Sequence, residues 1–177
     1  MRDELPGELA IFIGTEVHPF GVMRDPVEMS KIRQWCDTVG ETNPLYLDKG
    51  YAKATEFGVP VAPPAMLDAW VMPEYDPDRK VAGDYMPVLA ALTRHGYPVT
   101  VATDIEQHYA RYVKIGDRLR SRSIVESISP EKKTALGRGR FISIFTEFVD
   151  QNDAIVGTMR MGWFKFAPAQ SGKGKAL

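Results

Sequence analysis

RGRFISIFTEFVD, residues 138–150, is the stretch that decides the fold. It is apolar, aromatic and β-branched, and such side chains fit a pleated, half-buried strand. Residues 99–113 and 116–129 alternate polar and apolar residues, as strands do, and residues 154–167 complete the set. The segments that separate the stretches are typical of turns: residues 114–117, 129–137 and 150–154. Sequential strands joined by short loops predict an antiparallel sheet.

The chain before residue 98 follows a helical period instead. Residues 26–39 carry apolar side chains at helical spacing, with Asp25 as the expected cap and Gly40 as the expected stop. A second, shorter helix is expected over residues 49–58, where Asp48 can serve as the N-cap. The sequence therefore predicts a helical front half and a strand-rich back half.

A third expected helix, over residues 63–72, decides the architecture. Prolines cost little at its start, where N–H groups are unpaired anyway, and Pro73 ends it. Because one face of the sheet must be covered, this apolar helix predicts an α+β fold in which a curved antiparallel sheet wraps around one central helix. Residues 73–98 look like a long irregular connection. We expect residues 1–168 to form one domain and residues 169–177 a flexible tail.

Composition excludes several classes of function. Hydrophobic residues make up 44% and charged residues 25%, and the formal net charge is −1, so nothing indicates binding to nucleic acid or membrane. No apolar run reaches the roughly 20 residues of a membrane span, and the N-terminus makes a poor signal peptide. Cys36 is the single cysteine, so no disulfide and no cysteine-based metal site are expected. A cytoplasmic location fits best.

Residues 32–70 resemble the MaoC-like (R-specific) enoyl-CoA hydratases and dehydratases, in particular their dehydratase-like N-terminal branch. The motif GETNPLYLD, residues 40–48, carries the resemblance together with APP at 62–64. The later YVKIGDRL, residues 112–119, resembles the family's entry into a central strand. The resemblance implies the hot-dog fold, a CoA thioester as substrate, and no metal or other cofactor.

The two catalytic positions of the family's loop are altered. The family reads Gly-Asp-x-Asn-Pro-x-His-x-Asp, and its Asp and His activate water for addition to a trans-2-enoyl thioester. Glu41 and Tyr46 stand at these two positions here. Tyrosine, with an ordinary pKa of about 10, is a poor base at neutral pH. The extra methylene of Glu41 moves the carboxylate, and a displacement of about 1 Å can cost roughly a hundredfold in rate. We interpret the pair as a degenerate site.

The resemblance also implies substrate-binding positions. The backbone N–H groups of Ala65 and Met66 correspond to the family's oxyanion site, where free N–H groups and the helix dipole stabilise enolate charge. The family usually has glycine where Ala65 stands. Asn43 could contact ligand, although asparagine before proline also suits a tight turn, which is the favoured role.

The remaining polar candidates are weaker. Asp68 could activate water, as a carboxylate on the central helix does in hot-dog thioesterases, but a solvent-facing role is favoured. His18, His95 and His108 show no metal-ligand spacing, and a structural or surface role is favoured for them. A basic run could meet CoA phosphates but more commonly forms a solvated sheet face: Arg111, Lys114, Arg118, Arg120 and Arg122.

Together these features predict a subunit of a MaoC-like enoyl-CoA hydratase whose own site is impaired. A second MaoC-like hot-dog chain would supply the intact Asp and His and cover the exposed sheet edge. The alternatives are a self-sufficient homodimer that uses Glu41 and Tyr46, and a non-catalytic acyl-thioester binding module. Residues 73–98 would then shape a wide pocket for acyl groups, with fatty or steroid-like chains among the possibilities.

Overall fold

The computed structural model describes residues 5–18, 25–72 and 87–169. These residues form a six-stranded sheet in the order β1-β3-β5-β6-β2, with β4 paired to β5 outside this path. All pairs are antiparallel. The strands are β1 (Glu16–His18), β2 (Val99–Tyr109), β3 (Arg120–Ile128), β4 (Lys132–Thr134), β5 (Gly137–Val149) and β6 (Ile155–Pro168). The α+β class and the four long strands expected from the sequence are confirmed, whereas the three-residue strands β1 and β4 were not predicted.

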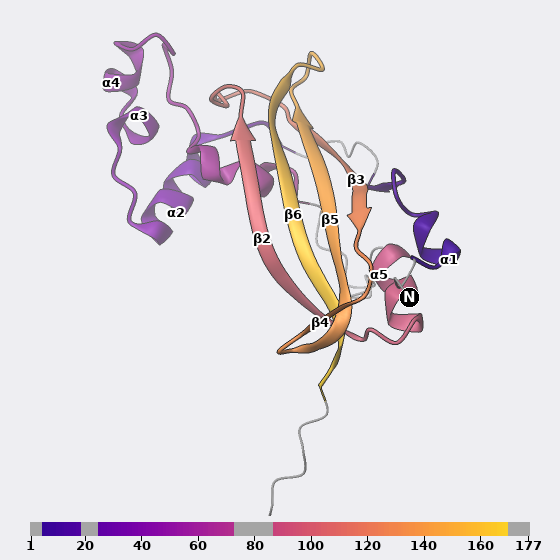
Figure 1. Ribbon diagram of the computed structural model, residues 1–177. Helices are drawn as coiled ribbons and strands as arrows, with labels where there is room; N and C mark the ends of the chain where they lie inside the picture. The colour runs from indigo at the N-terminus through magenta and orange to yellow at the C-terminus, as the bar shows by residue number, and fades with distance from the viewer. Residues whose placement is uncertain (1–4, 19–24, 73–86, 170–177) are drawn as a thin grey trace, which may run out of the picture.

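The helical elements lie at two ends of this sheet (Figure 1). Helices α2, α3 and α4 lie beyond β2, and α1 and α5 lie near β3. The α-helices are α1 (Gly7–Ala10), α2 (Met29–Val39), α3 (Pro44–Leu47), α4 (Lys49–Lys53) and α5 (Pro87–Arg94). Two 3₁₀ turns complete the set: η1 (Pro64–Met66) and η2 (Asp68–Trp70). No helix in the described part of the chain is long and apolar enough to cross a membrane.

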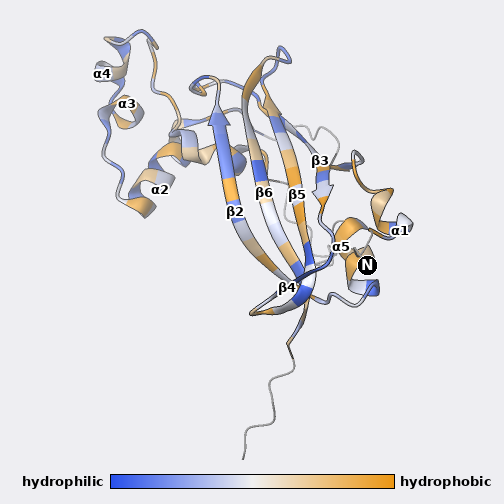
Figure 2. Cartoon of the chain, viewed as in Figure 1, coloured by the Kyte–Doolittle hydropathy of each residue, from blue (hydrophilic) through white to orange (hydrophobic). Residues whose placement is uncertain are grey.

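Strand β5 shows why the sheet has one inner face. Its even-numbered residues from Ile142 to Phe148 are buried, while the odd-numbered ones from Phe141 to Glu147 are more exposed. This alternation follows the period of two of a pleated strand. Figure 2 shows hydrophobic bands along β5 and on α1 and α5. The inner face therefore has to be covered, and two separate groups of side chains cover it.

The prediction of a central α-helix over residues 63–72 is wrong. The backbone there makes i to i+3 hydrogen bonds, from Met66 N to Pro63 O (2.9 Å) and from Leu67 N to Pro64 O (3.0 Å), as a 3₁₀ turn does. Prolines at 63 and 64 remove N–H groups, and the residue before Pro73 is biased away from the helical region. The segment is nevertheless buried at Met66, Leu67 and Trp70, so it still covers the sheet.

The expected irregular connection contains a regular helix. Helix α5 begins at Pro87, a favoured first helical position, and buries Val88, Leu89, Ala91 and Leu92. These residues pack with Ile142 and Ile144 of β5 in one cluster at the β3 side of the sheet. The proline content of the segment hid this amphipathic pattern. Residues 73–86 of the same prediction, the tail at 170–177 and the N-terminal residues 1–4 lie outside the described residues.

A second cluster, called the loop-side cluster below, joins the helical lobe to the sheet. The helical lobe is defined as residues 27–62, which carry α2, α3 and α4. Side chains of the lobe, of the 3₁₀ turns, of the segment between β2 and β3, and of strands β5 and β6 pack together here: Val27, Ile32, Cys36, Tyr46, Val61, Ala62, Met66, Leu67, Trp70, Val113, Leu119, Phe148, Val156 and Met159. Gly157 allows Leu67 to pack closely against the sheet, because a Cβ at position 157 would lie only 2.7 Å from the Leu67 side chain. The 3₁₀ turns thus replace the expected helix as the cover at this end.

The first predicted helix starts later than expected. Helix α2 begins at Met29, and Glu28 holds the N-cap position without a side-chain cap. The prediction that Asp25 caps this helix is therefore wrong. Its predicted stop is confirmed, because Gly40 has φ of 73° and its N–H donates to Cys36 O. A left-handed residue of this kind ends helices and favours glycine.

Candidate functional site

The loop that follows α2 carries the motif residues, and its own backbone is held by them. The Glu41 N–H donates to Cys36 O (2.9 Å), and Glu41 Oε1 accepts a hydrogen bond from the Asn43 N–H (2.8 Å). One oxygen of this carboxylate therefore closes the turn. A general base must reach the proton that it takes from water, and here half of the carboxylate already serves the loop.

Asn43 and Asp48 are capping residues. Asn43 Oδ1 accepts from the Leu45 N–H (3.0 Å) at the start of α3, where Pro44 occupies the first turn. Asp48 Oδ1 accepts from the N–H groups of Gly50 (2.7 Å) and Tyr51 (3.0 Å) and caps α4. The turn and capping roles favoured from the sequence are thus present. A ligand contact for Asn43, which is exposed, stays a prediction.

Tyr46 projects into the loop-side cluster and is only 7% exposed. Burial raises the pKa of its phenol to about 12, and neighbouring Tyr112 and Glu41 add to the rise. At neutral pH the phenol is therefore protonated. It can donate a hydrogen bond, but it cannot take a proton from water as the family's histidine does.

The 3₁₀ turn η1 holds the positions expected to bind a thioester carbonyl. The Met66 side chain lies in the same cluster as Tyr46, so the structure brings the loop and the turn together. The Met66 N–H, however, donates to Pro63 O (2.9 Å) and is already engaged. Ala65 beside it is exposed. A three-residue turn also adds little macrodipole, so an oxyanion role at Ala65 and Met66 stays a prediction that this geometry weakens.

The second 3₁₀ turn is pinned by the helical lobe. Lys31 Nζ donates to Ala69 O (2.6 Å) and lies 4.9 Å from the ring centroid of Trp70. Cation–π contacts of this kind stabilise by about 0.5–1 kcal/mol at exposed sites. Asp68, at the start of this turn, is exposed to solvent. Partial desolvation nevertheless raises the pKa of its carboxyl. No contact of Asp68 with Tyr46 or Glu41 is found among the described residues.

Three residues of the basic run are engaged by other parts of the chain. Arg120 pairs with Asp153, and Arg122 pairs with Glu147 (2.5 Å). Lys114 Nζ donates to Phe57 O (3.5 Å). The favoured interpretation was a solvated sheet face, and the ion pairs of Arg120 and Arg122 were not predicted; a contact of the run with CoA phosphates stays a prediction.

The histidines hold structural or surface positions where they are described. His95 Nε2 lies 3.1 Å from Glu8 Oε2 and joins α5 to α1. His108 is exposed and lies 3.3 Å from Glu106. Within residues 5–18, 25–72 and 87–169, no group of three or more histidine, cysteine or acidic residues is placed to hold a metal ion.

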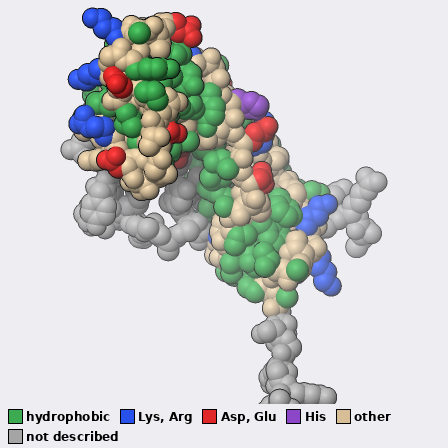
Figure 3. All heavy atoms as spheres, turned by 90° about the vertical axis from the view of Figure 1, so that its left-hand side faces the viewer, with side chains coloured by type: hydrophobic (Ala, Val, Ile, Leu, Met, Phe, Trp, Pro, Cys, Tyr) green, Lys and Arg blue, Asp and Glu red, His purple; other side chains and the backbone are tan. Residues whose placement is uncertain are grey.

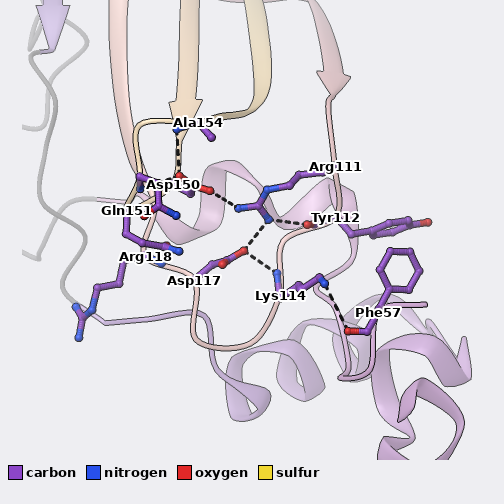
Figure 4. A network of polar contacts seen from close by, with 10 residues as sticks. Phe57, Arg111, Tyr112, Lys114, Asp117, Arg118, Asp150, Gln151 and Ala154 are labelled. Carbon is purple, nitrogen blue, oxygen red and sulfur yellow. Dashed lines mark hydrogen bonds and ion pairs between the residues drawn. The ribbon is translucent and has the colours of Figure 1, made fainter. Parts of the chain in front are cut away.

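Two residues near the site have roles that the sequence did not predict, because Tyr112 was given none and Arg111 was considered only as part of the basic run. Tyr112 packs against the loop-side cluster, and its ring meets that of Phe57 edge to face with centroids 5.1 Å apart. Arg111 pairs with Asp117 and Asp150 at 2.7 Å each (Figure 4). Their position four to six residues before the Gly116-Asp117 turn is the only local signal that could have drawn attention to them.

The chain matches a family model over residues 12–159, described as the FAS1-like dehydratase domain region. The chain belongs to this family. It is 41% identical over 152 residues to the probable enoyl-CoA hydratase alpha subunit of Thermomonospora curvata. It is 34% identical over 152 residues to the 3-oxo-4,17-pregnadiene-20-carboxyl-CoA hydratase alpha subunit of Mycobacterium tuberculosis.

The two alignments cover most of this chain but only about half of each relative. Each match takes in 84% of this chain but 47% of the relative, so the chain spans about half the length of the curated relatives that it matches. A chain of the ChsH1–ChsH2 complex from Mycobacterium tuberculosis is similar over more of its length. There the TM-score is 0.81 at 30% identity, covering 93% of this chain and 96% of that chain. A MaoC-like dehydratase from Rhodospirillum rubrum, at 19% identity and a TM-score of 0.59, shares the fold.

Proposed function

We propose that this chain is the hot-dog subunit of a heteromeric 2-enoyl-CoA hydratase, in which it binds the acyl thioester and a second MaoC-like chain supplies the acid–base pair. The observation that carries the proposal is the state of the two altered residues. Glu41 closes its own loop and Tyr46 is a buried, protonated phenol. The loop is therefore kept as a structure, while one oxygen of the Glu41 carboxylate is engaged within it and the Tyr46 phenol is neutral.

The relatives support the assignment of a subunit. Two of them, similar over most of this chain, are named as alpha subunits of CoA-ester hydratases. A third similar chain comes from a complex of two differently named proteins. These names describe the relatives, and they motivate the same kind of assembly for this chain.

Strand β2 supports a partner at the sheet edge. It is eleven residues long, lies at the end of the sheet path, and is exposed along most of its length. Ile105 is 57% and Tyr109 43% exposed. Figure 3 looks onto this edge and shows hydrophobic side chains below the more charged helical lobe. A strand with unpaired backbone groups and apolar side chains is a template for another sheet, and a second hot-dog chain would satisfy it.

The decisive experiment compares the chain alone with the chain in complex. The chain is co-expressed with MaoC-like proteins that carry an intact Gly-Asp-x-Asn-Pro-x-His loop, and hydration of crotonyl-CoA and longer 2-enoyl-CoA esters is assayed. We expect activity only in a complex, and we expect Glu41→Gln and Tyr46→Phe in this chain to leave it within a few-fold of the parent. The matched substitutions of Asp and His in the partner should cost about a hundredfold or more. Hydration by the isolated chain that Glu41→Gln abolishes would instead establish the self-sufficient homodimer.

A further inference from the structure

The segment between β2 and β3 is clamped by one arginine. Residues 110–118, called the hub segment here, carry Arg111, whose guanidinium lies between two carboxylates (Figure 4). Arg111 Nη1 donates to Asp117 Oδ2 (2.7 Å) and to Tyr112 O (2.8 Å), and Nη2 donates to Asp150 Oδ2 (2.7 Å). Arg111 with Asp117 and Asp150 is called the clamp below. Asp117 lies inside the hub segment, and Asp150 lies in the turn between β5 and β6.

The clamp is fixed at its sheet end. The side chains of Asp117 and Asp150 are only 13% and 7% exposed. Asp150 Oδ1 accepts from the N–H groups of Asn152 (2.8 Å) and Ala154 (3.1 Å), which locks the carboxylate in its turn. Burial opposes the charge of Asp150, but Arg111 and the two N–H groups outweigh it and lower the pKa of this carboxyl.

The other side of the hub segment holds the helical lobe at both of its ends. At the start of the lobe, the Val27 N–H donates to Asp117 O (2.8 Å), and the Gly116 N–H donates to Val27 O (2.9 Å). At its end, the Ala62 N–H donates to Val113 O (2.8 Å). The hub segment is therefore a shared support through which the lobe is attached to the sheet.

The hub segment also supports the lobe between those two ends. Tyr112 packs against the cluster that contains Tyr46, and its ring contacts Phe57. Lys114 reaches the Phe57 carbonyl and lies 5.9 Å from its ring centroid. These contacts bring the fixed hub segment directly against the interior of the candidate site.

We propose that Arg111 is a positioning residue for the candidate site. By linking Asp117 of the hub segment to Asp150 of the β5–β6 turn, Arg111 sets where Tyr112, Tyr46 and the helical lobe lie relative to the sheet. The alternative to a positioning role is that the ion pairs of Arg111 only stabilise the sheet. Exposed pairs contribute about 0–1 kcal/mol, but a carboxylate left buried without its partner is strongly unfavourable. Loss of Arg111 should therefore move the hub segment to rehydrate these carboxylates, and the lobe should move with it.

The first experiment needs no activity. The chain is labelled with 3-fluorotyrosine, and the ¹⁹F resonances of Tyr46 and Tyr112 are assigned with phenylalanine variants. In Arg111→Met both resonances should shift or broaden while that of Tyr97, on the α5 side, stays in place. Arg160→Met is the matched control, since Arg160 also binds two carboxylates, Glu106 (2.9 Å) and Glu126 (2.6 Å), but on the outer sheet face.

The control should leave the Tyr46 and Tyr112 resonances unchanged. Asp150→Asn, which removes one carboxylate charge of the clamp and keeps its shape, should shift the same two resonances by less; it also serves if Arg111→Met does not fold. Unchanged Tyr46 and Tyr112 resonances in a folded Arg111→Met or Asp150→Asn chain would overturn the proposal. So would equal shifts across all tyrosines.

The second experiment rests on the proposed function. In the active complex, Arg111→Met should raise KM for a 2-enoyl-CoA by about tenfold and leave kcat within about threefold, as loss of uniform binding does. Arg111→Lys, which keeps the charge and one contact, should recover part of the loss, and Arg160→Met should match the parent. A fall in kcat with KM unchanged would overturn a binding role for the lobe. If no complex is active, the proposed function fails, and the fluorine experiment still decides the positioning role.

Discussion

Tyr46 offers a direct test of the claim that the altered loop cannot act as a base at neutral pH. Its phenol pKa is raised from 10.0 to about 12, chiefly by burial. The rise corresponds to roughly 2.7 kcal/mol, at about 1.4 kcal/mol for each tenfold change in proton affinity. Because the folded-state pKa lies above the unfolded one, this stabilisation is fully present below about pH 10 and is lost as the pH rises through about 12.

The assay is urea unfolding of the parent and of Tyr46→Phe between pH 9 and pH 12. The free energy of unfolding of the parent should fall by about 2–3 kcal/mol more than that of the variant over this range. Tyr51→Phe, in which an exposed tyrosine of α4 is replaced, controls for tyrosine titration in the unfolded chain. Curves for the parent and Tyr46→Phe that run parallel from pH 9 to pH 12 would show that Tyr46 is not held as a neutral phenol, and the argument against a basic role would fail.

Three further outcomes are expected. Gly40→Ala should destabilise the chain by about 1 kcal/mol through its left-handed backbone, whereas Gly7→Ala, where an added Cβ also meets nothing within 4 Å, should be neutral or slightly stabilising in the same urea titration. Gly157→Ala should lower stability by about 2 kcal/mol or more, because the new Cβ would overlap Leu67 and the loop-side packing cannot absorb it; an unchanged midpoint would contradict the placement of the 3₁₀ turn. Ile105→Lys on the β2 edge should abolish co-purification with a MaoC-like partner without changing the circular dichroism spectrum, and retained binding would locate the interface elsewhere.

The sheet was predictable from the sequence because its signal is local. The alternation along β5 is visible without knowledge of its neighbours, and the hairpin to β6 needs only the short turn between them. The loop was also predictable, since Gly40, Asn43 and Asp48 act through backbone contacts within a few residues. Such short-range hydrogen bonds follow from residue type and position alone.

The helices were predicted less well because the apolar pattern and the prolines of these segments favour different structures. At residues 63–72 the apolar pattern favoured a helix, while three prolines within eleven residues limited it to 3₁₀ turns. At α5 the prolines around the segment hid a clear apolar stripe. The contact of Arg111 with Asp150 could not be predicted, because Asp150 lies 39 residues away and meets Arg111 only through the topology.

The strand order has a consequence for how the chain is made. Strand β2 pairs with β6 alone among the described strands, and β6 ends at Pro168, some sixty residues later in synthesis. The hairpin of β5 and β6 can close locally, but β2 cannot pair until β6 has been made, and pairing over a long loop is slow. An unpaired strand of eleven residues invites aggregation during this interval. Asp104 and Glu106 in its middle act as gatekeepers, since charges there discourage pairing with other nascent chains. The strand that carries the proposed partner edge is thus paired into the sheet only after β6 has been made.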